Sequence, residues 1–305
     1  MHIDVDLQKV SVQQEGEIFD LSFDRLVFTA GSALFRPDLT GLHEYAFSTD
    51  TYRETAKLDQ HIQRLPQITE QEGKYTAIII GGGVTGIEVS TEVMERLKEI
   101  AQRENKASEA RLIVEKALHD LYIEIRTNQT VRAIDSKGVT LETGERIASL
   151  TTIWSVGVKV SRLAACFPVK KDALGRLIVD PFLQVEGLPG IFAAGDTASA
   201  KTDDVHVSMM SCQHAIPQGK LAGHNVVCDL LGMKGIPYRQ EEYVTCLDLG
   251  AWGALYTKGW ERIPVSSGQE AKKIKQMINR MISPSEYKKR DDLFASSRPV
   301  EFRMN

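Results

Sequence analysis

Apolar and polar residues alternate near the start of the chain. Ile3, Val5 and Leu7 are spaced two positions apart, and the alternation resumes before the apolar run from Leu26 to Phe28. A period of two is typical of half-buried strands, and a continuous apolar run is typical of a buried strand. We therefore predict a β-meander that ends in a buried strand, followed over residues 38–67 by a surface connector with a loop and a helix.

A different pattern begins at Lys74. Residues 75–80, Tyr-Thr-Ala-Ile-Ile-Ile, are a short run rich in β-branched residues, and the sequence Gly-Gly-Gly-Val-Thr-Gly follows at residues 81–86. Residues 87–101 then have amphipathic helical spacing. Further strands are predicted at residues 111–115, 122–127, 130–134, 138–142 and 147–154. The order of strand, glycine turn, helix and further strands predicts an α/β unit.

The second half of the chain repeats the change from strand to loop. Residues 190–196, Gly-Ile-Phe-Ala-Ala-Gly-Asp, predict a strand that runs into a loop, and residues 209–231 predict a helix. Strands around 243–249 and 254–256, a basic helix over 269–282 and a polar tail complete the chain. The C-terminal part is therefore expected to be a small α+β unit.

Composition narrows the function classes. The 305 residues are 42% hydrophobic and 26% charged, which is ordinary for a folded chain of about two domains. The net charge of −4 gives no general attraction for nucleic acid. No apolar stretch approaches the length of a membrane span, and the acidic start lacks the pattern of a secretory signal, so we expect a cytoplasmic protein. The four cysteines and seven histidines have no metal-ligand spacing, so no metal is predicted.

The glycine sequence carries the clearest chemistry. Gly81, Gly83 and Gly86 have the spacing that permits a tight turn, close backbone approach to a pyrophosphate, and packing of a helix on a strand. Glu115, at the end of the next predicted strand, could accept the ribose hydroxyls of NAD, and its charge favours NADH over NADPH. A glycine turn without ligand and an ordinary strand-end glutamate are the alternatives.

Three segments in order resemble the two-dinucleotide-binding flavoprotein oxidoreductases, and most closely the type II NADH dehydrogenases. They are Thr-Ala-Gly-Ser at residues 29–32, Gly-Gly-Gly-Val-Thr-Gly-Ile-Glu at 81–88, and Gly-Ile-Phe-Ala-Ala-Gly-Asp at 190–196. Residues 153–158 and 211–220 add to the likeness. The resemblance implies an α/β flavoprotein with two dinucleotide-binding domains, in which a Rossmann-like NAD domain is inserted in a partial FAD domain.

The resemblance also implies the chemistry and the site. FAD would lie between NADH and a quinone-like acceptor, and hydride would pass from NADH to the flavin. The implied cofactor-binding residues are Gly81, Gly83 and Gly86 for the NADH pyrophosphate, Glu115 for its ribose and Asp196 for the flavin ribityl chain, with Thr29, Gly31, Gly157 and Gly195. Glu88 would lie near the contact of nicotinamide and flavin, and Gln213 at the flavin ring.

The chain also departs from the family pattern. Residues 1–80 hold no strand–Gly-x-Gly-x-x-Gly–helix segment for FAD, the insertion after Glu115 is short, and Cys212 and Pro217 replace an Ala and a Gln of the quinone motif. The expected domains are a partial FAD-binding domain at 1–72, an NAD domain at 73–157, the returning FAD segment at 158–232 and the C-terminal unit at 233–305.

These departures keep other functions open. One alternative is a catalytically incomplete nucleotide-binding remnant, or a subunit that needs a second chain. A thiol-based disulfide reductase is disfavoured because no two cysteines are closely spaced.

The basic helix from Gln269 to Ile282 allows two interpretations. Apolar residues recur on one of its faces, and lysines stand elsewhere on its surface. Such a helix can lie in a membrane interface, which would place the protein peripherally on the inner membrane face, or it can dock on the protein core. A homodimer is also expected.

Overall fold

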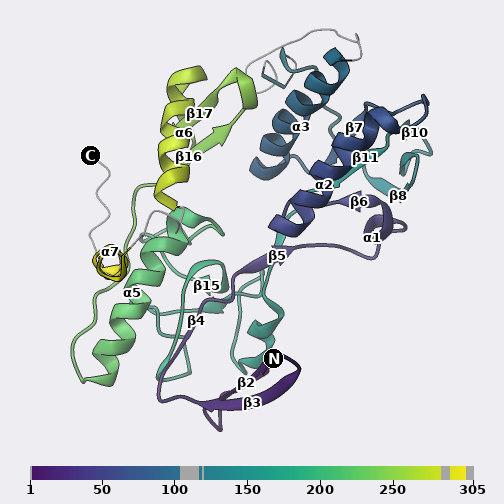
Figure 1. Ribbon diagram of the computed structural model, residues 1–305. Coiled ribbons are helices and arrows are strands. Elements are labelled where there is room, and N and C mark those ends of the chain that lie inside the picture. The colour runs from purple at the N-terminus through teal and green to yellow at the C-terminus, as the bar shows by residue number, and fades with distance from the viewer. Residues whose placement is uncertain (1, 104–116, 119, 283–288, 300–305) are drawn as a thin grey trace. The chain divides into compact units, whose positions relative to one another are not determined.

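The computed structural model describes residues 2–103, 117–118, 120–282 and 289–299. The chain divides into two compact units (Figure 1). Unit 1 comprises Met1–Ala33, Val158–Tyr243 and Met281–Asn305, and unit 2 comprises Leu34–Gly157 and Val244–Arg280. Each unit is therefore built from segments that are distant in the sequence.

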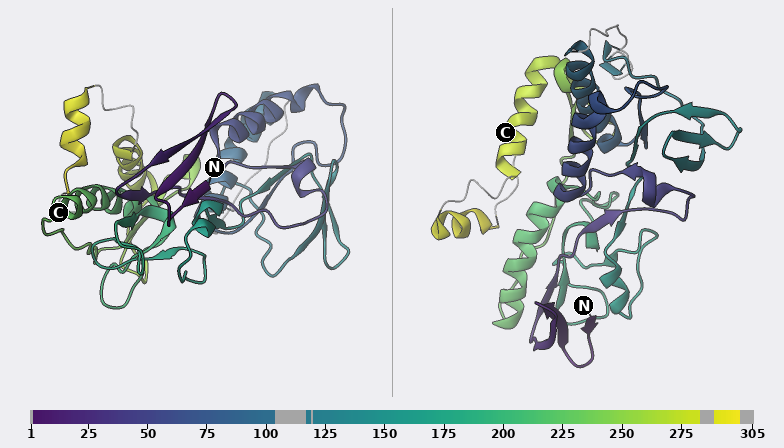
Figure 2. Two further views of the ribbon diagram at one scale, coloured as in Figure 1. Left: turned by 90° about the horizontal axis from the view of Figure 1, so that it is seen from below. Right: turned by 45° about the vertical axis from the view of Figure 1, so that its right-hand side comes forward.

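Unit 1 begins with an antiparallel sheet of β1 (His2–Asp4), β2 (Lys9–Gln14) and β3 (Glu17–Ser22). Figure 2 shows β2 and β3 as a twisted ribbon in purple. The predicted meander therefore forms, but every residue of β3 is exposed, so this strand is not half-buried. The parallel pairing of β4 (Leu26–Phe28) with β14 (Ile191–Ala193) joins the first segment to the second.

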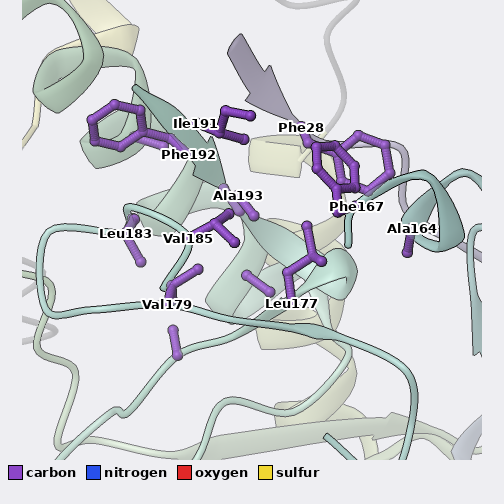
Figure 3. Close-up of a cluster of buried hydrophobic side chains, with 14 of the residues drawn as sticks. Phe28, Ala164, Phe167, Leu177, Val179, Leu183, Val185, Ile191, Phe192 and Ala193 are labelled. Carbon is purple, nitrogen blue, oxygen red and sulfur yellow. The ribbon is translucent and has the colours of Figure 1, made fainter. Parts of the chain in front are cut away.

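The core of unit 1 lies around this parallel pair. Phe28 packs against Phe167 with ring centroids 4.9 Å apart, and the almost completely buried Phe192 lies on the other side of the cluster (Figure 3). A long helix covers the core, and several short elements complete the unit. They are β5 (Ser32–Leu34), β12 (Val158–Val160), η2 (Arg162–Cys166), β13 (Leu177–Ile178), η3 (Gly195–Thr197), β15 (Ala198–Ser199), α5 (Cys212–Leu230) and α7 (Arg290–Ser297).

Unit 2 is organised around a parallel sheet in the order β6 (Ala46–Phe47), β11 (Thr151–Trp154) and β7 (Ala77–Ile80). Helices α2 (Tyr52–Arg64) and α3 (Val84–Arg103) pack on it through an apolar cluster. The buried members of that cluster are Leu58, Ile62, Leu65, Val93, Leu97 and Ile153. Residues 38–67 therefore contribute a strand and a core helix rather than only a surface connector.

Two antiparallel sheets complete unit 2. The first has the order β10 (Arg146–Ala148), β9 (Gly138–Leu141) and β8 (Val131–Asp135). The second has β16 (Val244–Asp248), β17 (Ala254–Lys258) and β18 (Ile263–Ser267), with α6 (Gly268–Ile282) beside it (Figure 1). The short elements are α1 (Leu42–Tyr45), η1 (Leu65–Gln67) and η4 (Gly250–Trp252).

Some predicted elements differ from the structure. Residues 122–127 are not a strand, and Tyr122 has a left-handed φ of 62°. The strand predicted over 147–154 is interrupted, because the Ser149 hydroxyl accepts a hydrogen bond from Thr151 N at 3.0 Å and turns the chain. Residues 111–115 lie outside the described part of the chain. Helix α7 and strand β18 were not predicted.

The two units also differ from the four expected domains. Residues 34–72 belong to unit 2, since β6 pairs with β11, and residues 244–280 belong to the same unit. The expected boundary at Gly157 is shared by both divisions. Within the described ranges, no helix is long and apolar enough to cross a bilayer.

Candidate functional site

The turn between β7 and α3 contains two kinds of glycine. A Cβ on Gly86 would lie 1.8 Å from the Gly81 carbonyl oxygen, and a Cβ on Gly81, which has φ of 126°, would lie 2.7 Å from Ser155 Oγ. These two glycines permit the close packing of the turn. Gly82 and Gly83 are exposed, and a Cβ on either would meet no atom within 4 Å. The backbone of Gly82 and Gly83 is thus open to a ligand.

The surroundings of this turn suit an anion. Helix α3 begins at Val84, and the first amides of a helix point away from it with a partial positive charge. Ser155, at the end of β11, donates through Oγ to the Ile80 carbonyl at 3.1 Å and so fixes the end of β7. The turn can therefore hold a phosphate with its backbone alone.

Glu88 lies in the first turns of α3 and is held by the C-terminal sheet and helix. Its Oε1 accepts from Lys275 Nζ at 2.7 Å and from the backbone N of Asp248 at 2.9 Å. Lys272 Nζ donates to Asp248 Oδ1 at 2.5 Å. Both lysines come from α6, one turn apart, and the side chains of both ion pairs are less than one third exposed. The negative charge of Glu88 is therefore balanced within unit 2.

In unit 1, Asp196 follows the end of β14. Its Oδ2 accepts from Ser32 Oγ at 2.5 Å, which connects the strand-to-loop segments at 29–32 and 190–196. Gly195 has φ of 71°, and its N donates to Oε1 of Gln218 on α5 at 2.8 Å. Two of the three segments that carry the family resemblance thus meet in one place.

The structure places three of the four remaining residues that were predicted to bind a cofactor. Gly31 has φ of 65°, its carbonyl accepts from Ser161 N at 2.9 Å, and a Cβ there would meet nothing within 4 Å. Thr29 is exposed. Gly157 belongs to unit 2, has φ of 62°, and accepts from Phe35 N at 3.1 Å. Glu115 lies outside the described residues.

In the first turn of α5, a side chain supplies a hydrogen bond that the helix backbone cannot make. Pro217 lies inside α5 and has no N–H to donate to the carbonyl of Gln213, four residues earlier. Gln240 Nε2 donates to that carbonyl instead, at 3.1 Å. The Pro217 that departs from the quinone motif is thus accommodated without leaving the Gln213 carbonyl unbonded.

A series of buried hydrogen bonds holds the Gln240 side chain in place. The hydroxyl of Tyr238 donates to Gln240 Oε1 at 3.1 Å, and His214 Nδ1 lies 3.1 Å from the same hydroxyl oxygen. Since the phenol hydrogen points to Gln240, His214 donates to the phenol through Nδ1. Burial lowers the pKa of His214 to about 4 and raises the pKa of Tyr238 to about 12. Both side chains are therefore neutral near pH 7.

The sequence-predicted residues fall into two sets. Thr29, Gly31, Gly195, Asp196 and Gln213 belong to unit 1. Gly81, Gly83, Gly86, Glu88 and Gly157 belong to unit 2. Sequence reasoning missed the groups that hold them, which are the side chains of Ser32, Gln218, Gln240 and Lys275 and the backbone amide of Asp248. The spacing of Lys272 and Lys275 on one helix face was the one available signal, but their carboxylate partners are far away in the sequence.

Together these features define an α/β protein in which a glycine turn at 81–86 leads from a parallel strand into a helix and leaves the backbone of Gly82 and Gly83 open. A family model described as "Pyridine nucleotide-disulphide oxidoreductase" matches residues 1–219. The chain belongs to this family. The match confirms the predicted resemblance and the predicted fold class.

Named relatives agree with this assignment. An NADH dehydrogenase-like protein of Mycobacterium tuberculosis is 43% identical over 297 residues, which cover 91% of this chain and 74% of that protein. A demethylphylloquinone reductase of Synechocystis is 29% identical over 269 residues, covering 83% of this chain and 66% of that protein. The structure of NDH2 from Plasmodium falciparum in complex with NADH has a TM-score of 0.72 at 14% identity, covering 97% of this chain and 81% of that one, and shows the fold alone.

Proposed function

We propose that the chain acts in an FAD-dependent NADH oxidoreductase that passes electrons to a quinone-like acceptor. The observation that carries the proposal is the β7–turn–α3 segment, in which Gly82 and Gly83 present open backbone at the start of a helix. The identity of 43% with an NADH dehydrogenase-like protein and the name of the demethylphylloquinone reductase support the donor and the class of acceptor.

The residues of unit 2 fit NADH. Gly81 and Gly86 shape the turn, and Gly83 leaves room for the pyrophosphate beside the first amides of α3. Glu115 is proposed to bind the ribose, and its negative charge would repel the additional phosphate of NADPH. Glu88, fixed by Lys275 and Asp248, is proposed to lie near the nicotinamide.

The residues of unit 1 fit the flavin. Asp196 has one carboxylate oxygen on Ser32, and a carboxylate can accept through its other oxygen from a ribityl hydroxyl. The open backbone at Thr29 and Gly31 and the α5 turn at Gln213 are proposed to complete the site, with Gly157 and Gly195. When bound, FAD supplies the hydride-accepting chemistry, and the chain supplies binding, orientation and charge balance.

Steady-state assays with reconstituted chain test this function. We expect NADH to be oxidised in the presence of a water-soluble naphthoquinone, and NADPH to be a poorer donor by at least about tenfold in kcat/KM. Asp196→Asn should weaken FAD binding. The other candidate, a nucleotide-binding chain that needs a second chain for catalysis, predicts NADH binding by the isolated protein without NADH oxidation.

Membrane contact through residues 269–282 is a finer part of the proposal. It is supported by Met277, which is 54% exposed, and by the exposed Lys273 on the same helix. Ala271 and Ile274, however, pack on Tyr256 and Ala254, so part of the apolar face is occupied by the sheet. Co-sedimentation with anionic vesicles should fall in Met277→Glu if the helix binds lipid.

Light scattering after gel filtration tests the expected homodimer.

A further inference from the structure

The loop that carries Asp196 is held from two sides. Ser32 Oγ donates to Asp196 Oδ2 at 2.5 Å, and Gly195 N donates to Gln218 Oε1 at 2.8 Å. Gly195 has a left-handed φ of 71° and opens the short turn η3, in which Asp196 is the second residue. A change in the Gly195 conformation would therefore redirect the Asp196 side chain.

Gln218 is well placed to prevent such a change. Its side chain is completely buried within α5, where a polar amide is unfavourable unless it makes a hydrogen bond. Ala215, one turn earlier on the same helix face, would lie 3.3 Å from a Cβ on Gly195. The face of α5 formed by Ala215 and Gln218 thus contacts Gly195 through packing and through one hydrogen bond.

We propose that Gln218 is a positioning residue for the flavin site. By accepting from Gly195 N, it fixes the turn that directs Asp196, while Ser32 holds one carboxylate oxygen and leaves the other for a ribityl hydroxyl. This inference rests on the proposed function, because it assigns the ligand of Asp196 as FAD. Gln218 itself touches Gly195 and does not need to touch the cofactor.

A double-mutant cycle on FAD affinity tests the inference. Gln218→Met keeps the approximate size of the side chain but removes the acceptor, and we expect the FAD dissociation constant to rise about tenfold. If Gln218 acts through Asp196, the same substitution in an Asp196→Asn background should change the constant by less than about twofold.

Asn225→Leu is the matched control. Asn225 is a buried amide on the same helix, but it bonds Phe182 and Ile236 rather than Gly195. This variant should lower the free energy of unfolding without changing the FAD dissociation constant of the folded chain. Wild-type FAD affinity in Gln218→Met, or equal effects in the Asp196 and Asp196→Asn backgrounds, would overturn the inference.

Amide hydrogen exchange separates this inference from the proposed function. In the flavin-free chain, the Gly195 amide should exchange at least about tenfold faster in Gln218→Met than in wild type, because its acceptor is gone. An unchanged rate overturns the positioning role whatever the cofactor. A wild-type chain that binds no FAD contradicts the proposed function instead, and the exchange rate then still decides whether Gln218 holds Gly195.

Discussion

Single residues in the glycine turn divide into those that shape the backbone and those that leave space. Gly86 approaches Gly81 so closely that no Cβ fits, whereas Gly83 is exposed with no atom near its missing Cβ. The same residue type thus serves the fold at one position and the ligand at another. Substitution by alanine should separate the two roles.

Gly83→Ala should change the free energy of unfolding by less than about 0.5 kcal/mol but weaken NADH binding at least tenfold, because the new methyl group occupies the space of the pyrophosphate. Gly86→Ala should instead destabilise the chain by about 2 kcal/mol or more. Denaturant unfolding and calorimetric titration with NADH measure the two effects. Normal NADH affinity in a folded Gly83→Ala variant would contradict the assigned site.

A second prediction at the scale of single residues concerns the hydrogen bond that Gln240 makes in place of Pro217. Gln240 supplies the donor that Pro217 cannot give to the Gln213 carbonyl. Gln240→Met should lower the free energy of unfolding by about 1–2 kcal/mol, since that carbonyl then lacks its donor. In a Pro217→Ala background the helix can supply its own N–H, so the loss should be smaller. Equal losses in both backgrounds would show that Gln240 acts in another way.

His214 predicts a pH dependence of stability. Burial, with a smaller contribution from the charge of Arg176, lowers its pKa from 6.5 to about 4 in the folded chain. Below about pH 6.5 the unfolded chain therefore binds a proton that the folded chain does not, and stability falls as the pH drops toward 4. The loss attributable to His214 is about 3 kcal/mol. Unfolding of His214→Phe should show a correspondingly weaker decline between pH 7 and about pH 4.5, and an unchanged decline would refute this role.

At the scale of elements, the sequence pattern predicted those helices and strands whose own residues have a clear hydrophobic period. The β-branched run at 75–80, the glycine turn and the following amphipathic spacing predicted β7 and α3 to within a few residues. Strand β18, a short edge strand with Pro264 in it, and α7, which has no buried residue, gave no such pattern. Neither segment therefore has a hydrophobic period from which an element could be predicted.

The prediction of the site residues was limited in the same way, because most of their partners are distant in the sequence. Gly81, Gly83 and Gly86 could be identified because their spacing is local. Glu88 could be named, but its partners Asp248 and Lys275 are 160 and 187 positions away, so no sequence pattern connects them. The lysines of α6 were expected to be solvated on its surface, whereas Lys275 is partly buried on Glu88. Only the folded chain brings these charges together.

Helix α6 is therefore expected to be docked by charge as well as by apolar packing. Lys275→Met leaves the partly buried Glu88 without its cation and should lower the free energy of unfolding by about 1–3 kcal/mol. Lys273→Met, at an exposed position of the same helix, is the control and should have little effect. Thermal unfolding of both variants checks the prediction, and equal stability would mean that the ion pair contributes nothing to docking.

At the scale of the whole molecule, the two units each carry part of one proposed activity. Unit 1 contains Asp196 with its supports, and unit 2 contains the turn at 81–86 with Glu88. The family match over residues 1–219 includes parts of both units, and the match to the mycobacterial relative covers 91% of this chain. The central claim is that this chain binds FAD and accepts electrons from NADH.

The most direct test is the visible absorption spectrum of the purified chain, recorded with added FAD after removal of unbound cofactor, and again after anaerobic addition of NADH. The account predicts flavin absorption bands that remain with the protein and are bleached by NADH. A chain that stays colourless after incubation with FAD, or flavin bands that persist in excess NADH, would contradict it.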